Sequence, residues 1–383
     1  MTKGASQRSS GLVRRPRAVA ATLLLGMFLF STVFGTLLFG GLAASSSTER
    51  ALPPGPVQSA TDGFDALSLA EQSLERGTNP STPLATYTPT TRADAVMTYD
   101  AKDGYVVLFG GVNKSGGLLS DTSTFVGGTW TKVTTSTHPA ARFNFAMSYD
   151  YKDRYVVLFG GAGKSGVTND TWKFVGGKWS KLSTAQSPPA RYDATMTYDS
   201  ADGYLVLFGG YGYAGVLNDT WTFVGGVWTN ITTSHHPAAA FGATMKYDPT
   251  DGYVVLFGGR GSSGAFDYLS TTWKFVGGSW TKLAPSSHPS GRFFAGMAYD
   301  SKDGYIVLFG GFKASGVLGD TWTFSGGTWT KLTPSPSPSG RDSAAMAYDP
   351  VDGYTVLFGG YGSSSTPLSG TWTFAGGSWA KLP

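Results

Sequence analysis

The sequence predicts an all-β protein: a six-bladed β-propeller with four antiparallel strands per blade, preceded by one N-terminal transmembrane or signal helix. Three observations lead to this prediction. A unit recurs six times along most of the chain, each copy contains four short strand-like runs, and no charged residue occurs from Ala18 to Ala44. A small four-stranded sheet cannot bury both of its faces alone, so the copies are expected to stack radially around an axis.

A pair of glycines marks each copy of the unit. The pairs begin 49–52 residues apart, at Gly110, Gly160, Gly209, Gly258, Gly310 and Gly359, and such a period is typical of repeat architectures. In the first copy the predicted strands are Val96–Asp100, Tyr105–Gly110, Thr122–Val126 and Trp130–Val133. The unbroken apolar run of the second strand predicts burial on both faces. The glycines predict a close approach of neighbouring backbones.

Each copy has a hydrophobic strand that ends in Gly-Gly, then an aromatic strand, then a tryptophan that opens the last strand. This pattern resembles the kelch repeat. The resemblance covers residues 90–383 and implies the central propeller of the galactose-oxidase-like superfamily, in a prokaryotic exported or membrane-anchored protein. The predicted blades span about 90–134, 140–183, 189–232, 238–284, 290–333 and 339–383. Each copy has its own four strands, so the ring is expected to close without strand exchange. The alternative is a strand at Leu84–Thr88 that joins the last blade.

Copy one departs from the kelch-like pattern in its third strand. It has Ser123 at the position where the other copies have Trp172, Trp221, Trp273, Trp322 and Trp372.

The N-terminal part predicts a membrane anchor. A basic tail, residues 1–17, precedes an uncharged segment, residues 18–44, which is long enough to span a bilayer. The basic flank predicts a cytoplasmic N-terminus and an extracellular propeller at the cell membrane. Cleavage as a signal peptide, with secretion, is the alternative, although the apolar segment exceeds the usual length of about 7–15 residues. Residues 45–89 form a Ser/Thr/Pro-rich linker with a short predicted helix at 62–76.

Charge and cysteine content exclude several classes of function. Most of the net positive charge lies in the tail, and the rest of the chain is nearly neutral. A nucleic-acid-binding protein carries its basic charge on the folded domain, so no nucleic-acid partner is expected. The chain has no cysteine, which excludes disulfides, a cysteine nucleophile and thiolate metal sites.

The repeat already explains most chemically active side chains. All eleven tryptophans occupy repeat positions, twelve aspartates form a Tyr-Asp-x-x-Asp turn, and four more begin third strands, at Asp121, Asp170, Asp219 and Asp320. Four aspartates are left as candidate catalytic residues should the protein be an enzyme: Asp94, Asp193, Asp267 and Asp342. Three of these follow an arginine closely, so a local ion pair is the alternative. The four histidines occur in loops between blades and should be spread around the ring, so neither a metal nor a cofactor is expected.

The variable loops between strands two and three and between blades predict the functional face. An arginine opens five copies: Arg92, Arg142, Arg191, Arg292 and Arg341. Copy four has Ala240 instead, and Arg260 after its Gly-Gly is predicted to replace the missing cation. Aromatic residues accompany the arginines at Phe143, Tyr192, Tyr211, Phe241, Phe266, Tyr268, Phe293, Phe312 and Tyr361. Flat rings supply stacking area and guanidinium groups supply paired hydrogen bonds, a combination suited to sugars, peptides or carboxylates.

The predicted function is an extracellular, membrane-tethered binding module that recognises a cell-surface glycan or protein through this face. The main alternative is a carbohydrate-active enzyme of the epimerase, lyase or hydrolase type, with its site at the mouth of the central channel. The resemblance implies this alternative, because kelch-like propellers include enzymes that act on sugars. The cysteine-modified tyrosine of the copper oxidase members cannot form here. A structural role in the cell envelope is a third hypothesis.

Overall fold

The structure is a computed structural model, and it describes residues 87–264 and 267–383. The predicted tail, membrane segment and linker helix, and Phe266, lie outside the described residues. Within the described part of the chain, no helix has the length and apolar character that a membrane span requires.

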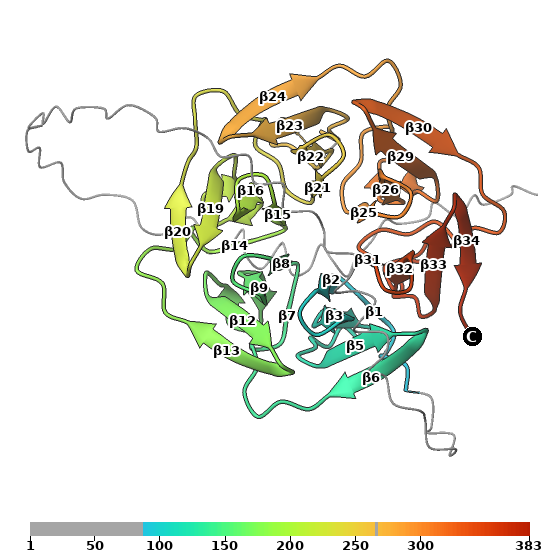
Figure 1. Ribbon diagram of the computed structural model, residues 1–383, viewed down its shortest axis with the longest axis horizontal. Helices are drawn as coiled ribbons and strands as arrows, with labels where there is room; N and C mark the ends of the chain where they lie inside the picture. Colours follow the sequence, from blue (N-terminus) through green and yellow to red (C-terminus); the bar gives the residue numbers. More distant parts are fainter. Residues whose placement is uncertain (1–86, 265–266) are drawn as a thin grey trace, which may run out of the picture. The chain divides into compact units, whose positions relative to one another are not determined.

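The described residues form six four-stranded antiparallel sheets, called blades one to six in chain order (Figure 1). The first, innermost strands are β2 (Val96–Asp100), β8 (Ala146–Asp150), β15 (Thr195–Asp199), β21 (Thr244–Asp248), β25 (Gly296–Asp300) and β31 (Ala345–Asp349). The second strands are β3 (Tyr105–Phe109), β9 (Tyr155–Phe159), β16 (Tyr204–Phe208), β22 (Tyr253–Phe257), β26 (Tyr305–Phe309) and β32 (Tyr354–Phe358). The third strands are β5 (Thr122–Val126), β12 (Thr171–Val175), β19 (Thr220–Val224), β23 (Thr272–Val276), β29 (Thr321–Ser325) and β33 (Thr371–Ala375). The fourth strands are β6 (Thr129–Val133), β13 (Lys178–Leu182), β20 (Val227–Asn230), β24 (Ser279–Leu283), β30 (Thr328–Leu332) and β34 (Ser378–Lys381).

Ten two-residue strands pair above the blades, on the side where the first strands begin. They are β1 (Arg92–Ala93), β4 (Val112–Asn113), β7 (Arg142–Phe143), β10 (Ala162–Gly163), β11 (Gly166–Val167), β14 (Arg191–Tyr192), β17 (Tyr211–Gly212), β18 (Gly215–Val216), β27 (Phe312–Lys313) and β28 (Gly316–Val317). They join the start of a first strand to the loop between strands two and three.

Apolar packing between neighbouring blades closes the ring. A separate cluster of buried side chains lies at each of the six junctions between blades. At the junction of blades six and one, Phe358 of β32 packs with Met97 of β2 and Trp130 of β6. Each blade is made of consecutive strands, with no strand exchange. Tyr87 and Thr88 are not in a strand, and the rest of the alternative closing strand lies outside the described residues.

The second strands are buried on both faces, as their apolar runs predict. In β3, Val106 to Phe109 are completely buried. Successive side chains point to opposite faces, so Val106 and Leu108 pack towards blade six, whereas Val107 and Phe109 pack towards blade two. Burial of both faces is what a blade requires when it has a neighbour on each side.

The Gly-Gly pairs mark the closest approach of neighbouring blades, as predicted. Gly110 has a φ of 64°, and a Cβ atom there would lie 2.7 Å from the carbonyl oxygen of Arg142 in blade two. The amide of Gly111 donates a hydrogen bond of 2.9 Å to the same oxygen. The contact recurs at all six junctions, including the one from Gly360 of blade six back to Arg92 of blade one. A side chain at either glycine would push two blades apart.

Two further hydrogen bonds tie each blade to the next. Each fourth-strand tryptophan donates its Nε1–H to a third-strand threonine of the preceding blade, over 2.8–3.0 Å; Trp130 donates to Thr371 and so joins blade one to blade six. On the opposite face, the second aspartate of each Tyr-Asp-x-x-Asp turn accepts a hydrogen bond from the glycine turn of the following blade. Asp352, for example, accepts from the amide of Gly127 at 2.7 Å.

Tyr87 compensates for the serine that copy one carries in its third strand. Its ring packs against the apolar cluster between blades six and one. Its hydroxyl lies 3.0 Å from Oγ of Ser123. The residue before the first blade therefore supplies an aromatic ring next to the one third strand that lacks tryptophan.

We predict that Thr371→Val destabilises the protein by about 1–3 kcal/mol, because the buried Nε1–H of Trp130 loses its acceptor. Thr321→Val, which removes the equivalent acceptor of Trp379 inside the ring, is the matched control and should cost a similar amount. Chemical denaturation measures both. Unchanged stability of Thr371→Val would show that this hydrogen bond does not help to close the ring.

Candidate functional site

A closed circle of backbone hydrogen bonds surrounds the axis where the first strands begin. The residue two positions after each leading residue (the arginine, or Ala240 in blade four) has a φ between 54° and 62°; these six mouth residues are Asp94, Asn144, Asp193, Gly242, Phe294 and Ser343. The amide of each donates to the carbonyl of the mouth residue in the preceding blade, over 2.8–3.2 Å. Asp94 donates to Ser343 and completes the circle.

The mouth residues line a cavity of about 130 Å³ at this end of the central channel. The first strands line a second cavity of about 160 Å³ deeper in the channel, and the two share Ala95, Phe145 and Ala194 among their walls. A positive φ is strained for a residue such as Phe294, and aspartate and asparagine tolerate it better. The circle thus holds side chains at fixed positions around one small opening.

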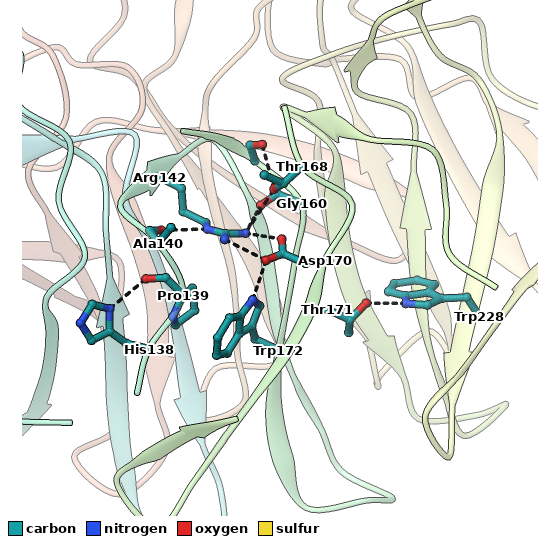
Figure 2. Close-up of polar contacts among 11 residues, drawn as sticks. His138, Pro139, Ala140, Arg142, Gly160, Thr168, Asp170, Thr171, Trp172 and Trp228 are labelled. Carbon is teal, nitrogen blue, oxygen red and sulfur yellow. Dashed lines mark hydrogen bonds and ion pairs between the residues drawn. The ribbon is translucent and has the colours of Figure 1, made fainter. Parts of the chain in front are cut away.

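The leading arginines do not form part of that opening. They are only 1–3% exposed, in contrast to the predicted ring of guanidinium groups on the binding face. Four of them form paired hydrogen bonds of 2.5–3.0 Å with the aspartate before the third strand of their own blade. Figure 2 shows Arg142, which also donates to the carbonyl oxygens of Ala140 and Gly160. These arginines hold the start of a blade together, and so we no longer assign them to ligand binding.

The predicted local ion pairs of Asp94 and Asp193 are also wrong, because their arginines pair with other aspartates. Arg92 pairs with Asp121 rather than Asp94, and Arg191 pairs with Asp219 rather than Asp193. Hydrogen bonds and the charge of Arg142 outweigh the burial of Asp170 and hold the pKa of this carboxyl at about 2.

Blades four and six lack the complete pair. Blade four has Ala240 and Thr271 in place of the arginine and the aspartate, so both members of the repeated pair are replaced there. The guanidinium of Arg260 instead lies 5.7 Å from the centre of the Phe241 ring. Blade six keeps Arg341 but has Gly370 at the aspartate position. Burial lowers the pKa of Arg341 to about 10, and its guanidinium donates to Ser339 and Gly359.

Three of the four unexplained aspartates gather near the mouth. Asp94 and Asp193 are mouth residues. Asp342 is buried beside them and accepts a hydrogen bond from Ser343. Burial raises the pKa of Asp94 to about 6, against hydrogen bonds from Ser343 and Tyr361. Burial and the charge of Asp94 raise the pKa of Asp193 well above its ordinary value.

The fourth aspartate, Asp267, lies apart from this group. Its carboxylate accepts a hydrogen bond from the amide of Ser263 within the long loop of blade four, and it does not line the mouth cavity.

An unbroken series of partly exposed aromatic rings extends over blades three, four and five. Ring centres lie 5.5–5.9 Å apart from one member to the next, in the order Tyr192, Tyr211, Phe241, Phe293 and Phe312, with Tyr268 also against Phe293. Phe294 of the mouth stacks on Phe293 at 4.3 Å. We call this set the aromatic series; it joins the mouth to the loops of blade four.

The remaining predicted aromatics lie elsewhere. Phe143 belongs to β7 of blade two and pairs with Ala162. Tyr361 of blade six faces Asp94, and burial together with the charge of Asp94 raises the pKa of its hydroxyl.

Several residues of the site were not predicted from the sequence. Asn144, Gly242, Phe294 and Ser343 complete the mouth, and an alignment of the six copies two positions after the leading residue would have found them. Lys246 was also missed. It lines the deeper cavity, where the other copies have Thr, Ser or Ala, and burial lowers its pKa to about 8.

The histidines are distributed as predicted. Nδ1 of His138, His236 and His288 each lies 2.8–2.9 Å from the carbonyl oxygen of the following proline, in three different blades. In the described residues no group of three His, Cys, Asp or Glu side chains is arranged to hold a metal ion.

Radially packed four-stranded sheets with Gly-Gly contacts between them define a β-propeller of the kelch class. The chain belongs to the kelch-repeat β-propellers: the family model described as Attractin/LZTR1 beta-propeller matches residues 173–374, more than half of the chain. A second model, the KLHDC2/KLHL20/DRC7 Kelch-repeats domain, matches residues 60–223. This fold generally serves as a protein-interaction module.

Among solved structures, the one described as "Structure of YjhT" superposes with a TM-score of 0.60 at 16% identity. The match covers 77% of this chain and 99% of that chain. At this identity the similarity concerns the fold alone. A comparison with curated proteins found no match.

We predict that Asp170→Thr destabilises the protein by about 3–5 kcal/mol, because it leaves the buried Arg142 unpaired. The double variant Arg142→Ala/Asp170→Thr introduces the residues that blade four carries naturally, and it should cost less than Asp170→Thr alone. Urea denaturation of both single variants and the double variant measures the coupling. Additive costs would mean that the pair does not act as a unit.

We also predict that stability is greatest near pH 4. Burial raises the pKa of Asp94 and of turn aspartates such as Asp100 and Asp150 from 3.8 to about 6. The folded protein holds these protons more tightly than the unfolded chain, so stability falls as pH rises from about 4 through 6. The pKa of Asp170 is lowered in the folded protein, so protonation of this carboxyl reduces stability below pH 4. Denaturation midpoints across pH 3–8 check this, and a midpoint that increases steadily up to pH 8 would contradict it.

Proposed function

We propose that this protein is an extracellular, membrane-tethered recognition module that binds a surface protein or glycan partner through the loop face of its propeller. The observation that carries the proposal is the aromatic series, whose partly exposed rings contact one another across the loop face of three neighbouring blades. Loops over a rigid scaffold commonly carry binding. The kelch family, in which interaction is the general role, supports a protein partner first.

The corrected position of the arginines changes the chemistry of this face. Four of the five leading guanidinium groups pair with aspartates inside the blades, and all five arginines are buried, so they are not offered to a ligand carboxylate. Rings suited to stacking remain, together with one guanidinium at Arg260 and the acidic groups of the mouth. Such a surface favours partners with apolar or aromatic groups and positive charge over acidic ones.

The tether is proposed from the uncharged segment at 18–44 and its basic flank. An uncleaved anchor with this flank places the propeller outside the cell. Labelling intact cells with a membrane-impermeant amine reagent tests the proposal. Propeller lysines that react only after lysis would refute it.

Outward-facing lysines speak against lateral self-association as the main role. Exposed lysines recur on the outermost strands, at Lys132, Lys181, Lys282, Lys331 and Lys381. Charged side chains on an edge strand oppose edge-to-edge pairing.

One observation favours the second candidate, a carbohydrate-active enzyme. Asp94 and Asp193 share one cavity and both have raised pKa values, as an acid–base pair requires. The cavity volumes count against this candidate, since the mouth cavity of about 130 Å³ and the adjoining deeper cavity of about 160 Å³ together reach only the lower end of the roughly 300–1,000 Å³ typical of small-molecule sites. Turnover of a glycoside or uronate panel that disappears in Asp193→Asn would reverse this preference.

We predict that the full-length protein in detergent binds members of a glycan and surface-protein panel, and that Tyr211→Ala and Arg260→Gln each weaken this binding at least about tenfold, or 1.4 kcal/mol. The first change removes a ring of the aromatic series, and the second removes the guanidinium that lies over the Phe241 ring. Tyr151→Ala removes an exposed ring from a turn between strands one and two, on the opposite face, and should leave binding unchanged. An empty panel, or an equal loss in Tyr151→Ala, would contradict the proposal.

A further inference from the structure

We infer that the mouth binds a primary ammonium group, as the lysine side chain of a protein partner presents it. This inference rests on the proposed function and specifies the partner's chemistry. It concerns the mouth residues, which lie beside the aromatic series but are distinct from it.

Four consecutive blades supply oxygen atoms to the mouth. Ser343, Asp94, Asn144 and Asp193 follow one another from blade six to blade three, and the circle of backbone hydrogen bonds fixes them. The side chain of Asn144 donates to Asp193, while hydroxyl groups of Ser343 and Tyr361 hydrogen-bond with Asp94. A carboxylate pair surrounded by fixed polar groups provides the acceptors that an ammonium's three N–H donors need.

Asp193 supplies the second observation that points to a ligand. It is 8% exposed, it lines the mouth cavity, and no described protein group donates a hydrogen bond to its Oδ1 atom. A buried carboxylate oxygen without a donor is costly. This oxygen is therefore positioned to accept from a donor that enters the cavity.

The opposite side of the mouth is apolar. Gly242 and Phe294 come from blades four and five, and a Cβ atom at Gly242 would lie 2.7 Å from the Phe294 ring. Glycine at this position therefore leaves room for the Phe294 ring, which lines the mouth cavity. A lysine has a flexible aliphatic stem below its charged group, so the stem can contact Phe294 while the ammonium reaches the carboxylates.

Within the described part of the chain, no basic side chain lines the mouth cavity. The arginines of blades one and three pair with Asp121 and Asp219. Lys246 lines the deeper cavity but not the mouth. The other titratable groups that face the carboxylates are Asp342, Tyr192 and Tyr361, all acidic or neutral. Burial raises the pKa values of Asp94 and Asp193, and the charge of Asp94 adds to the rise at Asp193. A cation in the mouth would relieve this cost of negative charge.

An ammonium fits the mouth better than a divalent metal ion. Calcium takes about 6–8 oxygen ligands, usually with several carboxylates. The mouth contains two carboxylates, and three-residue metal groups are absent among the described residues. A cavity of about 130 Å³ also admits an ammonium with part of its stem more readily than a sugar ring.

The test uses the full-length protein in detergent, with Nα-acetyl-lysine methylamide as probe and its Nε-acetylated form as the neutral control. Calorimetry or saturation-transfer NMR should detect binding of the charged probe only. Binding should strengthen as pH rises from 5 to 8, because Asp94 loses its proton near pH 6. A separate experiment measures binding of calcium chloride in the absence of the lysine probe.

Substitutions inside and outside the mouth test whether the lysine probe binds there. Asp193→Asn should weaken probe binding at least tenfold, whereas Asp267→Asn, the same charge change in a loop outside the mouth, should leave it unchanged. Asn144→Asp adds a third mouth carboxylate and should tighten binding, so the inference stays testable even if Asp193→Asn fails to fold.

Three results would overturn the inference: no probe binding, equal binding by folded Asp193→Asn, or binding of calcium without the lysine probe. If binding of the panel partners still depended on Tyr211 in that case, the proposed function would stand. If neither the panel partners nor the lysine probe bound, both proposals would be contradicted.

Discussion

At every junction between blades, two glycines bring the end of one second strand against the carbonyl group of the next leading residue. The contact leaves no room for a Cβ atom, as the 2.7 Å approach at Gly110 shows, and the glycine amide holds the carbonyl directly. Because the same carbonyl belongs to the start of the next blade, this contact sets the distance between blades. The tryptophan–threonine and aspartate–glycine hydrogen bonds can then form at the same spacing around the ring.

The position of the leading residue determines what its side chain can do. Its carbonyl is held by the glycine amide and its guanidinium is turned to the aspartate of the third strand, so an arginine here is a structural residue. Blade four lacks both the arginine and the aspartate, whereas in blade six Arg341 has no aspartate partner and donates to Ser339 and Gly359 instead. The leading residue forms the contact between blades, whereas the mouth residue two positions later faces the central axis.

Those six residues, rather than the arginines, determine the electrostatics of the mouth. They share a backbone conformation that aspartate, asparagine and glycine adopt readily, which explains much of their composition. Their side chains differ from blade to blade, so the opening has an acidic half and an apolar half. A scaffold that repeats six times thereby presents a site without sixfold symmetry. That asymmetry gives the loop face its chemical selectivity in our proposal.

Local patterns allowed much of the fold to be predicted from the sequence. Strand positions, buried second strands, turn aspartates and the role of the glycines depend on interactions within one copy or between adjacent copies, and the repeat displays each of them six times. The aromatic residues of the loops were also found in this way, but the contacts between their rings were not.

Tertiary structure decided the pairing of charges and the site itself. Arg92 lies next to Asp94 in sequence but pairs with Asp121, because strand pairing carries the two side chains to one place while the positive φ of Asp94 turns it to the axis. Convergence of Asp94, Asn144 and Asp193 depends on closure of the ring, which brings together residues about 50 positions apart. The sequence by itself determined the repeat and its core; only the closed ring decided which repeated position faces a shared opening.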